Sequence, residues 1–414
     1  MAVDRRRFLA AVGAVAIARG QSQPDPRAIP ELRPMTDGIQ PIADSERRER
    51  MDKARRLMVE NKIGGIFLEG GSSLFYFTGV RWGRSERTFG AVLPARGDLA
   101  WVVPAFEEAR ARELIRFDAD IRTWEEDESP FRRIAQILKD RGIVGRSVGV
   151  EEQVRFFVFD GIRKQAPSAE LVSADPVTAG CRMIKGPAEI ALLQRANNIT
   201  IAAYRAGLAT LDEGMSPSAL ADNIRAAYRA LGVTGDVTVN FGEYTAFPHG
   251  SVQPQKLRPG DIVQIDDGCT VEGYQSDITR TVVFGKPSPR QIEIWNLERK
   301  AQDAAFAAAR PGATCESVDA AARKVITDAG FGPGYKVPGL PHRTGHGIGL
   351  DGHEWPYLVR GNRTLLRPGM CFSDEPMIAI YGEFGIRLED CMYITEDGAR
   401  MFTRQSPGID QPFG

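Results

Sequence analysis

The sequence predicts an α+β protein in which a smaller α/β domain precedes a larger catalytic domain. The chain has 414 residues, enough for two domains. A proline- and glycine-marked boundary falls between residues 176 and 187, and from Asp236 onward short strands alternate with helices. Hydrophobic residues make up 43% and charged residues 26%, as in a globular protein with a sizeable core.

The first 18 residues have the layout of an export signal. Arg5, Arg6 and Arg7 precede Phe8, and a short apolar run at 10–18 ends in a small-x-small pattern. The paired arginines resemble a twin-arginine signal, which implies export to the periplasm. The apolar run is shorter than the roughly twenty residues that a membrane span needs, so we expect no stable membrane insertion. A frayed basic N-terminus is the alternative interpretation.

Residues 19–43 are expected to form a linker or an arm over the surface, because their first part is rich in Pro, Gln and Asp. Residues 44–176 should form the smaller α/β domain. Asp44 can cap a first helix, and a second helix is expected over 131–138. Strands are predicted at 65–68, 74–77, 89–93, 99–103 and 147–150.

Residues 187–400 are predicted to form the catalytic domain, followed by a C-terminal tail at 401–414. Pro187 and Pro217 each favour the start of a helix. Two further helices are expected near 289–309 and 315–329.

Charge and cysteine content exclude several classes of protein. The formal net charge is −1, so nothing favours nucleic acid or an anionic membrane as a partner. The five cysteines are scattered and include no C-x-x-C pair. We therefore expect them to be buried apolar residues and not a disulfide framework or a zinc ribbon.

Two aspartates are predicted to meet at the ends of neighbouring strands. A buried-type strand at 262–265 leads into Asp266, and a second strand is expected over 277–284, beginning with Asp277. Adjacent antiparallel strands can bring these carboxylates close together. Buried carboxylates repel each other, so the pair favours a cation between them. A protonated pair or solvent-exposed strand ends are the alternatives.

All four histidines lie in the second half of the chain, at His249, His342, His346 and His353. The last three fall among glycines, which let the backbone approach another element closely. A lone histidine is most often structural, but three in so polar a stretch favour chemistry. The same glycines argue against an H-E-x-x-H zinc helix.

Two further carboxylates, Glu375 and Glu389, follow on separate predicted strands. Glu375 precedes a proline, and strand alternation places Glu389 on the same face as Arg387. A simple Arg387–Glu389 salt bridge is the alternative for that segment.

Four carboxylates and one imidazole make a ligand set for divalent cations. The set consists of Asp266, Asp277, His346, Glu375 and Glu389. Hard oxygen ligands with one nitrogen suit Mn²⁺, Co²⁺, Fe²⁺ or Zn²⁺. Four negative charges neutralise two such ions, and a pair of metals about 3.5–4 Å apart can polarise a carbonyl. Asp267 and Asp374 add acidity beside the ligands.

These motifs, in this order, resemble the signature of the pita-bread metallopeptidases. The resemblance is carried by Asp266-x-Gly268, Gly273-Tyr274-x-x-Asp277-Ile-Thr-Arg-Thr281, His346-Gly-x-Gly-Leu-x-x-His353, Glu375-Pro376 and Gly385-Ile-Arg387-Leu-Glu389-Asp390. It covers roughly residues 44–400 and is strongest to the Xaa-Pro aminopeptidases and prolidases. It therefore implies a pita-bread catalytic domain behind a creatinase-like α/β domain.

The resemblance also implies a role for each residue. Asp266 would bind one of two metal ions, Asp277 and Glu389 would bridge both, and His346 and Glu375 would complete the set. His249 and His353 match substrate-contacting histidines, and His342 and Arg387 match positions beside the ligands. Mn²⁺ is the first expectation for the metal. A homodimer or tetramer is also implied, with Trp82 as a candidate to cover a neighbour's site and ordinary core packing as its alternative.

The predicted reaction is hydrolysis of the bond between an N-terminal residue and proline in a peptide, by a hydroxide that bridges the two ions. Glu375 would carry a proton to the prolyl nitrogen, while His249 or His353 stabilises the oxyanion. The sequence does not separate an aminopeptidase from a dipeptidase. A creatinase-like C–N hydrolase, a lyase acting on a small molecule and a non-catalytic binding module are the alternatives. Retention of all five ligands counts against the C–N hydrolase and the binding module.

Overall fold

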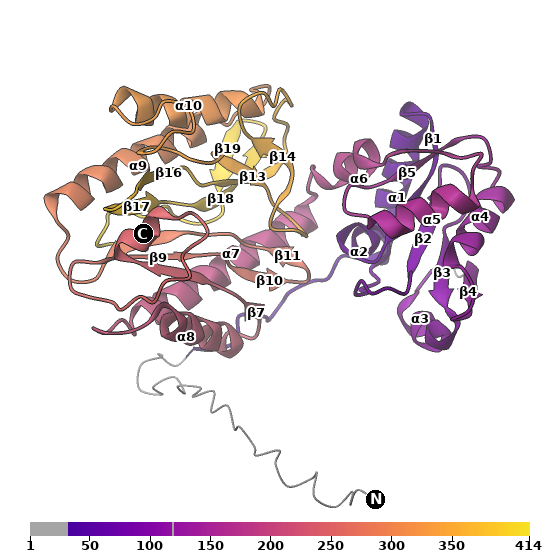
Figure 1. The fold of residues 1–414 in the computed structure, drawn as a ribbon, viewed down its shortest axis with the longest axis horizontal. Coiled ribbons are helices and arrows are strands. Elements are labelled where there is room, and N and C mark those ends of the chain that lie inside the picture. Colours follow the sequence, from indigo (N-terminus) through magenta and orange to yellow (C-terminus); the bar gives the residue numbers. More distant parts are fainter. Residues whose placement is uncertain (1–31, 118–119) are drawn as a thin grey trace, which may run out of the picture.

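The computed structural model describes residues 32–117 and 120–414 of the chain. The predicted export signal at 1–18 and the first part of the arm lie outside the described residues. Figure 1 shows a smaller domain, drawn in indigo to magenta, beside a larger one, drawn in magenta to yellow. Within the two described ranges, no helix has the length and apolar character that crossing a membrane requires.

The smaller domain is a six-stranded sheet with helices on both faces. The strand order is β4-β3-β2-β1-β5-β6. The strands are β1 Ile63–Glu69, β2 Gly90–Pro94, β3 Ala100–Pro104, β4 Asp120–Trp124, β5 Ser147–Val150 and β6 Glu170–Ser173. The helices are α1 Asp44–Glu60, α2 Ser72–Thr78, α3 Glu108–Leu114, α4 Pro130–Asp140, α5 Phe156–Gln165 and α6 Asp175–Arg182, with a 3₁₀ turn at Ala105–Glu107. The β1–β2 and β2–β3 pairs are antiparallel and the other pairs are parallel.

Alternating side chains explain why this sheet is covered on both faces. On β1, Ile66 and Leu68 belong to the core that includes α1, whereas Phe67 between them belongs to the core formed with α4 and α5. Successive residues of a strand point to opposite faces, so an uninterrupted apolar strand requires helices on each side.

The predicted strand at 74–77 is wrong. These residues lie in α2, which Gly79 ends in a left-handed conformation at φ 78°. A short apolar run carries no period that distinguishes a strand from a buried helix. A carbonyl near the end of α2 is hydrogen-bonded from outside the helix, because Arg50 Nη1 on α1 donates to Tyr76 O at 3.1 Å. The sequence alone does not indicate this contact.

The larger domain contains four helices and several small antiparallel sheets. The helices are α7 Pro187–Leu208, α8 Pro217–Ala230, α9 Pro289–Ala308 and α10 Cys315–Asp328, with a 3₁₀ turn at Gly242–Ala246. The first strands are β7 Thr234–Gly235, β8 Thr238–Phe241, β9 Ile262–Asp266, β10 Cys269–Val271, β11 Tyr274–Gln275 and β12 Arg280–Val283. The later strands are β13 Gly345–Gly347, β14 Glu354–Leu358, β15 Cys371–Asp374, β16 Met377–Ile380, β17 Phe384–Arg387, β18 Asp390–Thr395 and β19 Gly398–Met401.

The strands of the larger domain are held between two pairs of helices. Helices α7 and α8 pack on the sheets β11-β10-β7 and β12-β9-β8, whereas α9 and α10 pack on β14-β13-β15-β18-β19 and β16-β17. Figure 1 shows α9 and α10 above the strands and α8 below them. Serine caps begin two of these helices, since Ser216 Oγ accepts from Ala219 N and Ser288 Oγ accepts from Gln291 N. The predicted Asp44 cap is wrong, because Asp44 is the first residue of α1 and the N-cap residue Ala43 makes no side-chain capping bond.

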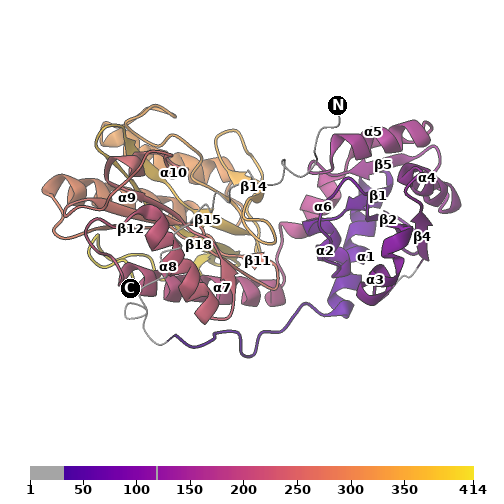
Figure 2. The ribbon, with the colours of Figure 1, turned by 60° about the horizontal axis from the view of Figure 1, so that its bottom comes forward.

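Both ends of the described chain lie against the larger domain. Met35 N donates to Leu231 O at 2.9 Å, and Figure 2 shows this arm running on to the smaller domain. Near the C-terminus, Pro412 O accepts a hydrogen bond from Arg280 Nε at 2.9 Å. All five cysteines are buried and free, as the sequence predicts.

Candidate metal centre

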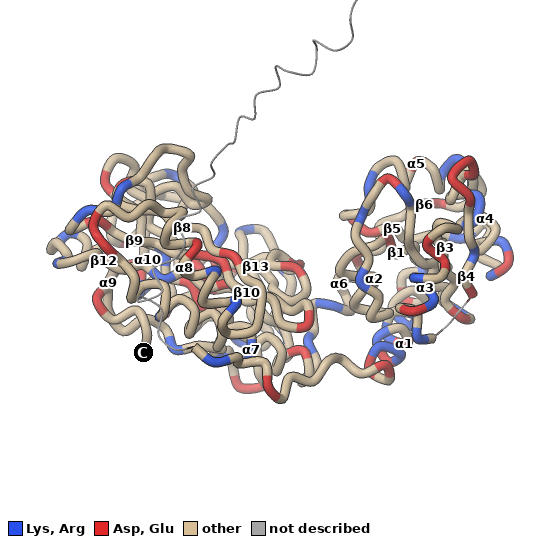
Figure 3. The backbone as a smooth tube through the Cα atoms, turned by 90° about the horizontal axis from the view of Figure 1, so that it is seen from below, with Lys and Arg blue, Asp and Glu red and all other residues tan. Residues whose placement is uncertain are grey.

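The five side chains predicted as metal ligands converge in the middle of the larger domain. Asp266 ends β9, Asp277 lies between β11 and β12, His346 lies in β13, Glu375 follows β15, and Glu389 lies between β17 and β18. Figure 3 shows acidic segments, in red, gathered near β8 and β13. The predicted strand at 277–284 is shorter than expected, because β12 begins only at Arg280. Asp277 therefore lies in the connecting segment and faces the end of β9 from there.

Ligand-type atoms of these residues form groups small enough to hold an ion. Atoms of Asp266, Asp277 and Glu389 all lie within 4.8 Å of one another, and so do atoms of His346, Glu375 and Glu389. Glu389 belongs to both groups, which places the groups side by side. A third group of the same size joins Asp277 and His346 to His353.

Two of the carboxylates, those of Asp277 and Glu389, are buried beside more negative than positive charge. Burial, followed by repulsion from Asp266, raises the pKa of Asp277 well above its usual range. Burial, followed by repulsion from Asp277, does the same to the pKa of Glu389. Glu389 Oε1 is buried without a hydrogen-bond partner among the described residues. An orphaned, crowded carboxylate of this kind is stabilised by a divalent cation, so the residues fit a metal site.

Arg387 and Thr279 hold the carboxylates from one side. Arg387 Nη2 donates to Asp266 Oδ2, and its Nε donates to Thr279 Oγ1 at 2.9 Å. Thr279 Oγ1 lies 2.6 Å from Asp266 Oδ1 and 2.7 Å from Glu389 Oε2. Arg387 Nη1 also donates to Pro248 O at 3.2 Å, which ties the loop of His249 to the same guanidinium. The site is thus braced by hydrogen bonds that orient its acidic residues.

The histidines differ in their surroundings. His346 Nε2 lies 3.0 Å from Glu375 Oε1, and the His346 and His353 rings are 3.9 Å apart at their centroids. Burial, followed by the charge of His346, lowers the pKa of His353 to about 4. His342 Nδ1 lies 2.7 Å from Arg343 O, and burial lowers the pKa of His342. His249 is exposed.

The glycines on either side of His346 allow β13 to lie close to its neighbouring strands. The sequence predicts this close approach of the backbone. A Cβ at Gly345 would lie 2.1 Å from Ser373 O, and one at Gly347 would lie 2.6 Å from Glu354 O. Neither distance accommodates a side chain, so both positions require glycine if β13 is to lie between β14 and β15.

The two extra aspartates of the acidic segments have different surroundings. Asp267 adopts a φ of 95°, and its Oδ2 accepts a hydrogen bond from Thr238 Oγ1 at 2.8 Å. Asp374 is buried with neither carboxylate oxygen hydrogen-bonded among the described residues. Burial, followed by repulsion from Asp390 and Glu298, raises the pKa of Asp374 well above its usual range. Asp374 belongs to none of the three candidate groups in the described chain, although it precedes Glu375.

Two hydroxyl residues of the site are not among the predicted residues. Thr279 contacts two of the carboxylates, as described above. Ser373 Oγ accepts from His346 N at 3.0 Å and lies 3.1 Å from Glu375 Oε1. Each stands two residues from a predicted ligand, and that spacing is the only sequence signal that could have indicated them.

Comparisons with known proteins agree with this geometry. Residues 191–396 match the model of metallopeptidase family M24, and residues 50–184 match that of the creatinase/prolidase N-terminal domain. A protein named Xaa-Pro dipeptidase from Lactobacillus delbrueckii subsp. lactis is 32% identical over 86% of this chain and 97% of its own length. The sequence prediction of a pita-bread domain behind a creatinase-like domain is confirmed.

Solved structures give the same result. The dipeptidase PepE from Mycobacterium ulcerans matches with a TM-score of 0.81 and 34% identity, covering 88% of this chain and 97% of that one. The prolidase from Thermococcus sibiricus matches with a TM-score of 0.79 and 30% identity, covering 86% and 96%. Membership of this family implies a site for two metal ions, which the paired acidic groups around Glu389 fit. The chain belongs to metallopeptidase family M24.

Proposed function

We propose that this metallopeptidase cleaves the bond between an N-terminal residue and proline. The observation that carries the proposal is the convergence of the five ligand-type side chains into two groups that share Glu389. The names of the relatives support the substrate, since those from Lactobacillus delbrueckii subsp. lactis and Pyrococcus furiosus are both Xaa-Pro dipeptidases at 32% and 31% identity.

Asp266, Asp277, His346, Glu375 and Glu389 would hold two divalent ions, and we propose Mn²⁺ as the preferred metal. The donor chemistry is compatible with that choice, as it is with Co²⁺, Fe²⁺ or Zn²⁺, because the two groups that share Glu389 contain carboxylates and one imidazole and no thiolate. Bound there, the ions would supply Lewis-acid chemistry, acidifying a water molecule and polarising the scissile carbonyl.

The protein's own groups would perform the proton transfers and orient the substrate. The Glu375 carboxylate takes a proton from the attacking water and delivers it to the prolyl nitrogen as the bond breaks. His346 Nε2 lies 3.0 Å from Glu375 Oε1, so these two proposed ligands face the same candidate ion position. His249 or His353 donates a hydrogen bond to the oxyanion, and Arg387 keeps Asp266 and the His249 loop in place.

The test is to load the purified protein with Mn²⁺ and compare Xaa-Pro dipeptides with Xaa-Pro-Xaa tripeptides. Release of the N-terminal residue from either confirms the proposal, and the ratio of kcat/KM separates a dipeptidase from an aminopeptidase. Hydrolysis of Xaa-Ala peptides at the same rate would contradict the preference for proline. Absence of peptide hydrolysis would favour the C–N hydrolase, lyase or binding-module alternatives.

Two further proposals concern the whole chain. Export to the periplasm by the twin-arginine route is supported by Arg5 and Arg6 before an apolar run. Assembly into a homodimer or tetramer is supported by the family resemblance alone. Trp82 stacks on Phe89 with ring centroids 3.9 Å apart, which matches the core-packing alternative for that residue. Full activity of a monomer in sedimentation at dilute concentration would contradict the assembly.

A further inference from the structure

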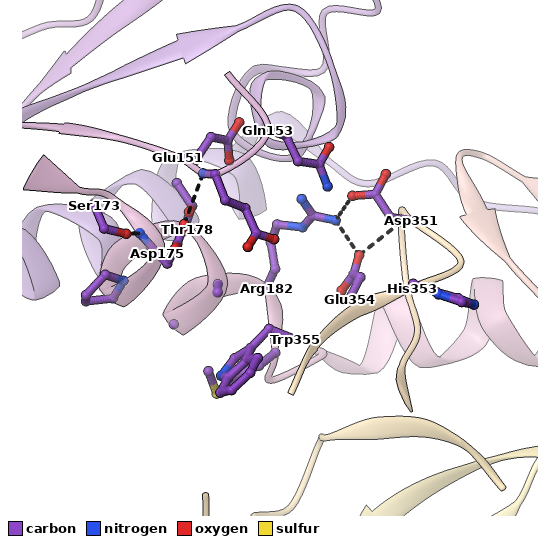
Figure 4. Close-up of a pocket in the computed structure, with 15 residues that line it drawn as sticks. Glu151, Gln153, Ser173, Asp175, Thr178, Arg182, Asp351, His353, Glu354 and Trp355 are labelled. Atoms are coloured by element: carbon purple, nitrogen blue, oxygen red, sulfur yellow. Dashed lines mark hydrogen bonds and ion pairs between the residues drawn. The ribbon is translucent and has the colours of Figure 1, made fainter. Parts of the chain in front are cut away.

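A pocket of about 530 Å³ lies between the two domains, beside the metal centre, and His353 is among the residues that line it. The smaller domain contributes the segment from Glu151 to Gln153 and helix α6, and the larger domain contributes residues from Asp351 to Trp355. Figure 4 shows Arg182 of α6 pointing toward Asp351 and Glu354 across this boundary. None of the five predicted metal ligands lines the pocket.

One part of the pocket wall is apolar. Pro176, Ala179 and Met183 line it, and Trp355 lines it with 42% of its surface exposed. A cavity of a few hundred Å³ with a mainly apolar lining and a few polar groups is the usual form of a site for a small organic ligand. An exposed indole there can cover an apolar body or the face of a cation.

The charged part of the pocket wall contains more acidic than basic side chains. Five carboxylates line it, those of Glu151, Glu152, Asp175, Asp351 and Glu354, with Arg182 as the only cation in that lining. Arg182 is already paired, because its Nη2 lies 2.7 Å from Asp351 Oδ2 and 2.5 Å from Glu354 Oε1. Ser73 Oγ donates to Glu151 Oε2 at 2.6 Å, and burial raises the pKa of Glu151. Arg182 Nη1 donates to the same Ser73 Oγ at 3.2 Å, so Arg182 acts on the Glu151 carboxylate through a hydroxyl and not by a direct ion pair among the described residues.

We infer that this pocket binds an organic cation with an apolar body, such as an amine or guanidinium on a ring or alkyl chain. The Glu151 carboxylate receives the cationic group, and Trp355 and Ala179 cover the apolar part. The chemistry fits two sources: a basic residue of a longer peptide substrate, or a separate small amine.

The position of the pocket links an occupant to the metal centre. The loop that forms its wall carries His353, whose ring lies 3.9 Å from that of His346. The same loop is held by Arg182 and by Leu350 N, which donates to Glu354 Oε1 at 2.8 Å. A ligand in this pocket would contact both domains and also the loop that carries His353. Only the peptide source rests on the proposed function, whereas binding of an amine does not.

Calorimetry with the metal-loaded full chain tests the site itself. The probes are phenethylamine and phenethyl alcohol, which share a shape and differ in charge. We expect one phenethylamine per chain and binding of the alcohol at least about tenfold weaker, because the charge-assisted contact is lost. Glu151→Gln should weaken phenethylamine by a similar factor, and Ala179→Leu, which fills the pocket, should abolish binding. Glu213→Gln removes an equal charge from an exposed loop and should change nothing.

Absence of saturable phenethylamine binding would overturn the inference, as would binding unaffected by both pocket variants in folded protein. Kinetics then identify the source. If it is a peptide residue, Xaa-Pro-Lys should have a lower KM than Xaa-Pro-Leu, and Glu151→Gln should remove the difference. If it is a separate amine, phenethylamine should change kcat for a dipeptide without competing with it. Should no peptide be hydrolysed, the calorimetry still decides the site, so the two proposals fail independently.

Discussion

Arg387 Nε donates a hydrogen bond to Thr279 Oγ1 at 2.9 Å, and this contact directs the proton of the Thr279 hydroxyl. A hydroxyl that accepts from a guanidinium has one proton left to donate. Two carboxylate oxygens compete for it, Asp266 Oδ1 at 2.6 Å and Glu389 Oε2 at 2.7 Å. Thr279 therefore joins Asp266 and Glu389, which belong to the same candidate group, to the arginine that supports them.

Thr279→Val should weaken metal binding without unfolding the protein. Valine has nearly the same shape, but it leaves two carboxylates without their shared donor. Loss of such a supporting partner costs about 10–100-fold in metal affinity or activity. Thr281→Val is the matched control, since Thr281 Oγ1 donates to the main-chain carbonyl of Arg387 at 2.6 Å and both threonines are buried. Equal metal affinity in the two variants, measured by competition with a chelator, would remove Thr279 from the site.

The metal content of active protein should be about two ions per chain. Four ligand carboxylates carry more charge than one divalent ion neutralises, and burial together with neighbouring carboxylates raises the pKa values of both Asp277 and Glu389. Elemental analysis of fully active protein measures the ratio directly. A single ion per chain at full activity would show that only one of the two groups around Glu389 binds a metal ion.

Glu375→Gln and Arg387→Lys should fail in different ways. Glutamine keeps the size and one oxygen of Glu375 but removes the base, and losing a positioned base costs about 10²–10⁴ in rate. Lysine keeps the charge of Arg387 but cannot reach Asp266, Thr279 and Pro248 together. Added metal should rescue Arg387→Lys in part and leave Glu375→Gln unchanged. Near-normal turnover by folded, metal-loaded Glu375→Gln would exclude Glu375 as the proton carrier.

Export should depend on the paired arginines. Changing Arg5 and Arg6 to Lys keeps the charge but removes the twin-arginine pattern, so the variant should remain in the cytoplasm. Fractionation followed by immunoblotting measures the distribution. An unchanged periplasmic yield would contradict the twin-arginine route, and a cytoplasmic wild-type protein would contradict export altogether.

The five candidate ligands can be selected from the sequence because they occur in short motifs with glycines that favour a close packing of strands, and the structure places their side chains together. It predicts α2 wrongly because a few apolar residues carry no period. Thr279 and Ser373 are missed because a hydroxyl is chemically unremarkable until its neighbours are known. The Arg182 contacts with Asp351 and Glu354 join residues about 170 positions apart in the chain. Such a contact depends on the packing of two domains, for which a single sequence contains no local signal.

The last prediction concerns Glu354, which is buried against two cations at the domain boundary. Its Oε1 lies 2.5 Å from Arg182 Nη2, and its Oε2 lies 3.0 Å from Lys185 Nζ. Burial alone would raise the pKa of Glu354, but Arg182 and then Lys185 outweigh it and lower the pKa from 4.5 to about 2. The folded protein therefore binds this proton less readily than the unfolded chain does.

The sign of the pH dependence follows from that difference. A depressed carboxyl pKa contributes stability that is complete above the unfolded value near 4.5 and is lost as the pH falls toward about 2. At roughly 1.4 kcal/mol for each pKa unit, the contribution at neutral pH is about 3 kcal/mol.

Glu354→Gln, which leaves Lys185 and part of Arg182 unpaired, should therefore lower the free energy of unfolding by a similar amount at pH 7. The difference from wild type should shrink steadily between pH 4.5 and pH 2, because protonation of Glu354 makes the wild type resemble the variant. Urea unfolding of both proteins across that range measures the difference, with the exposed Glu213→Gln as the control. A difference that stays constant down to pH 2 would show that the Glu354 carboxylate is not stabilised by Arg182 and Lys185 in the folded protein.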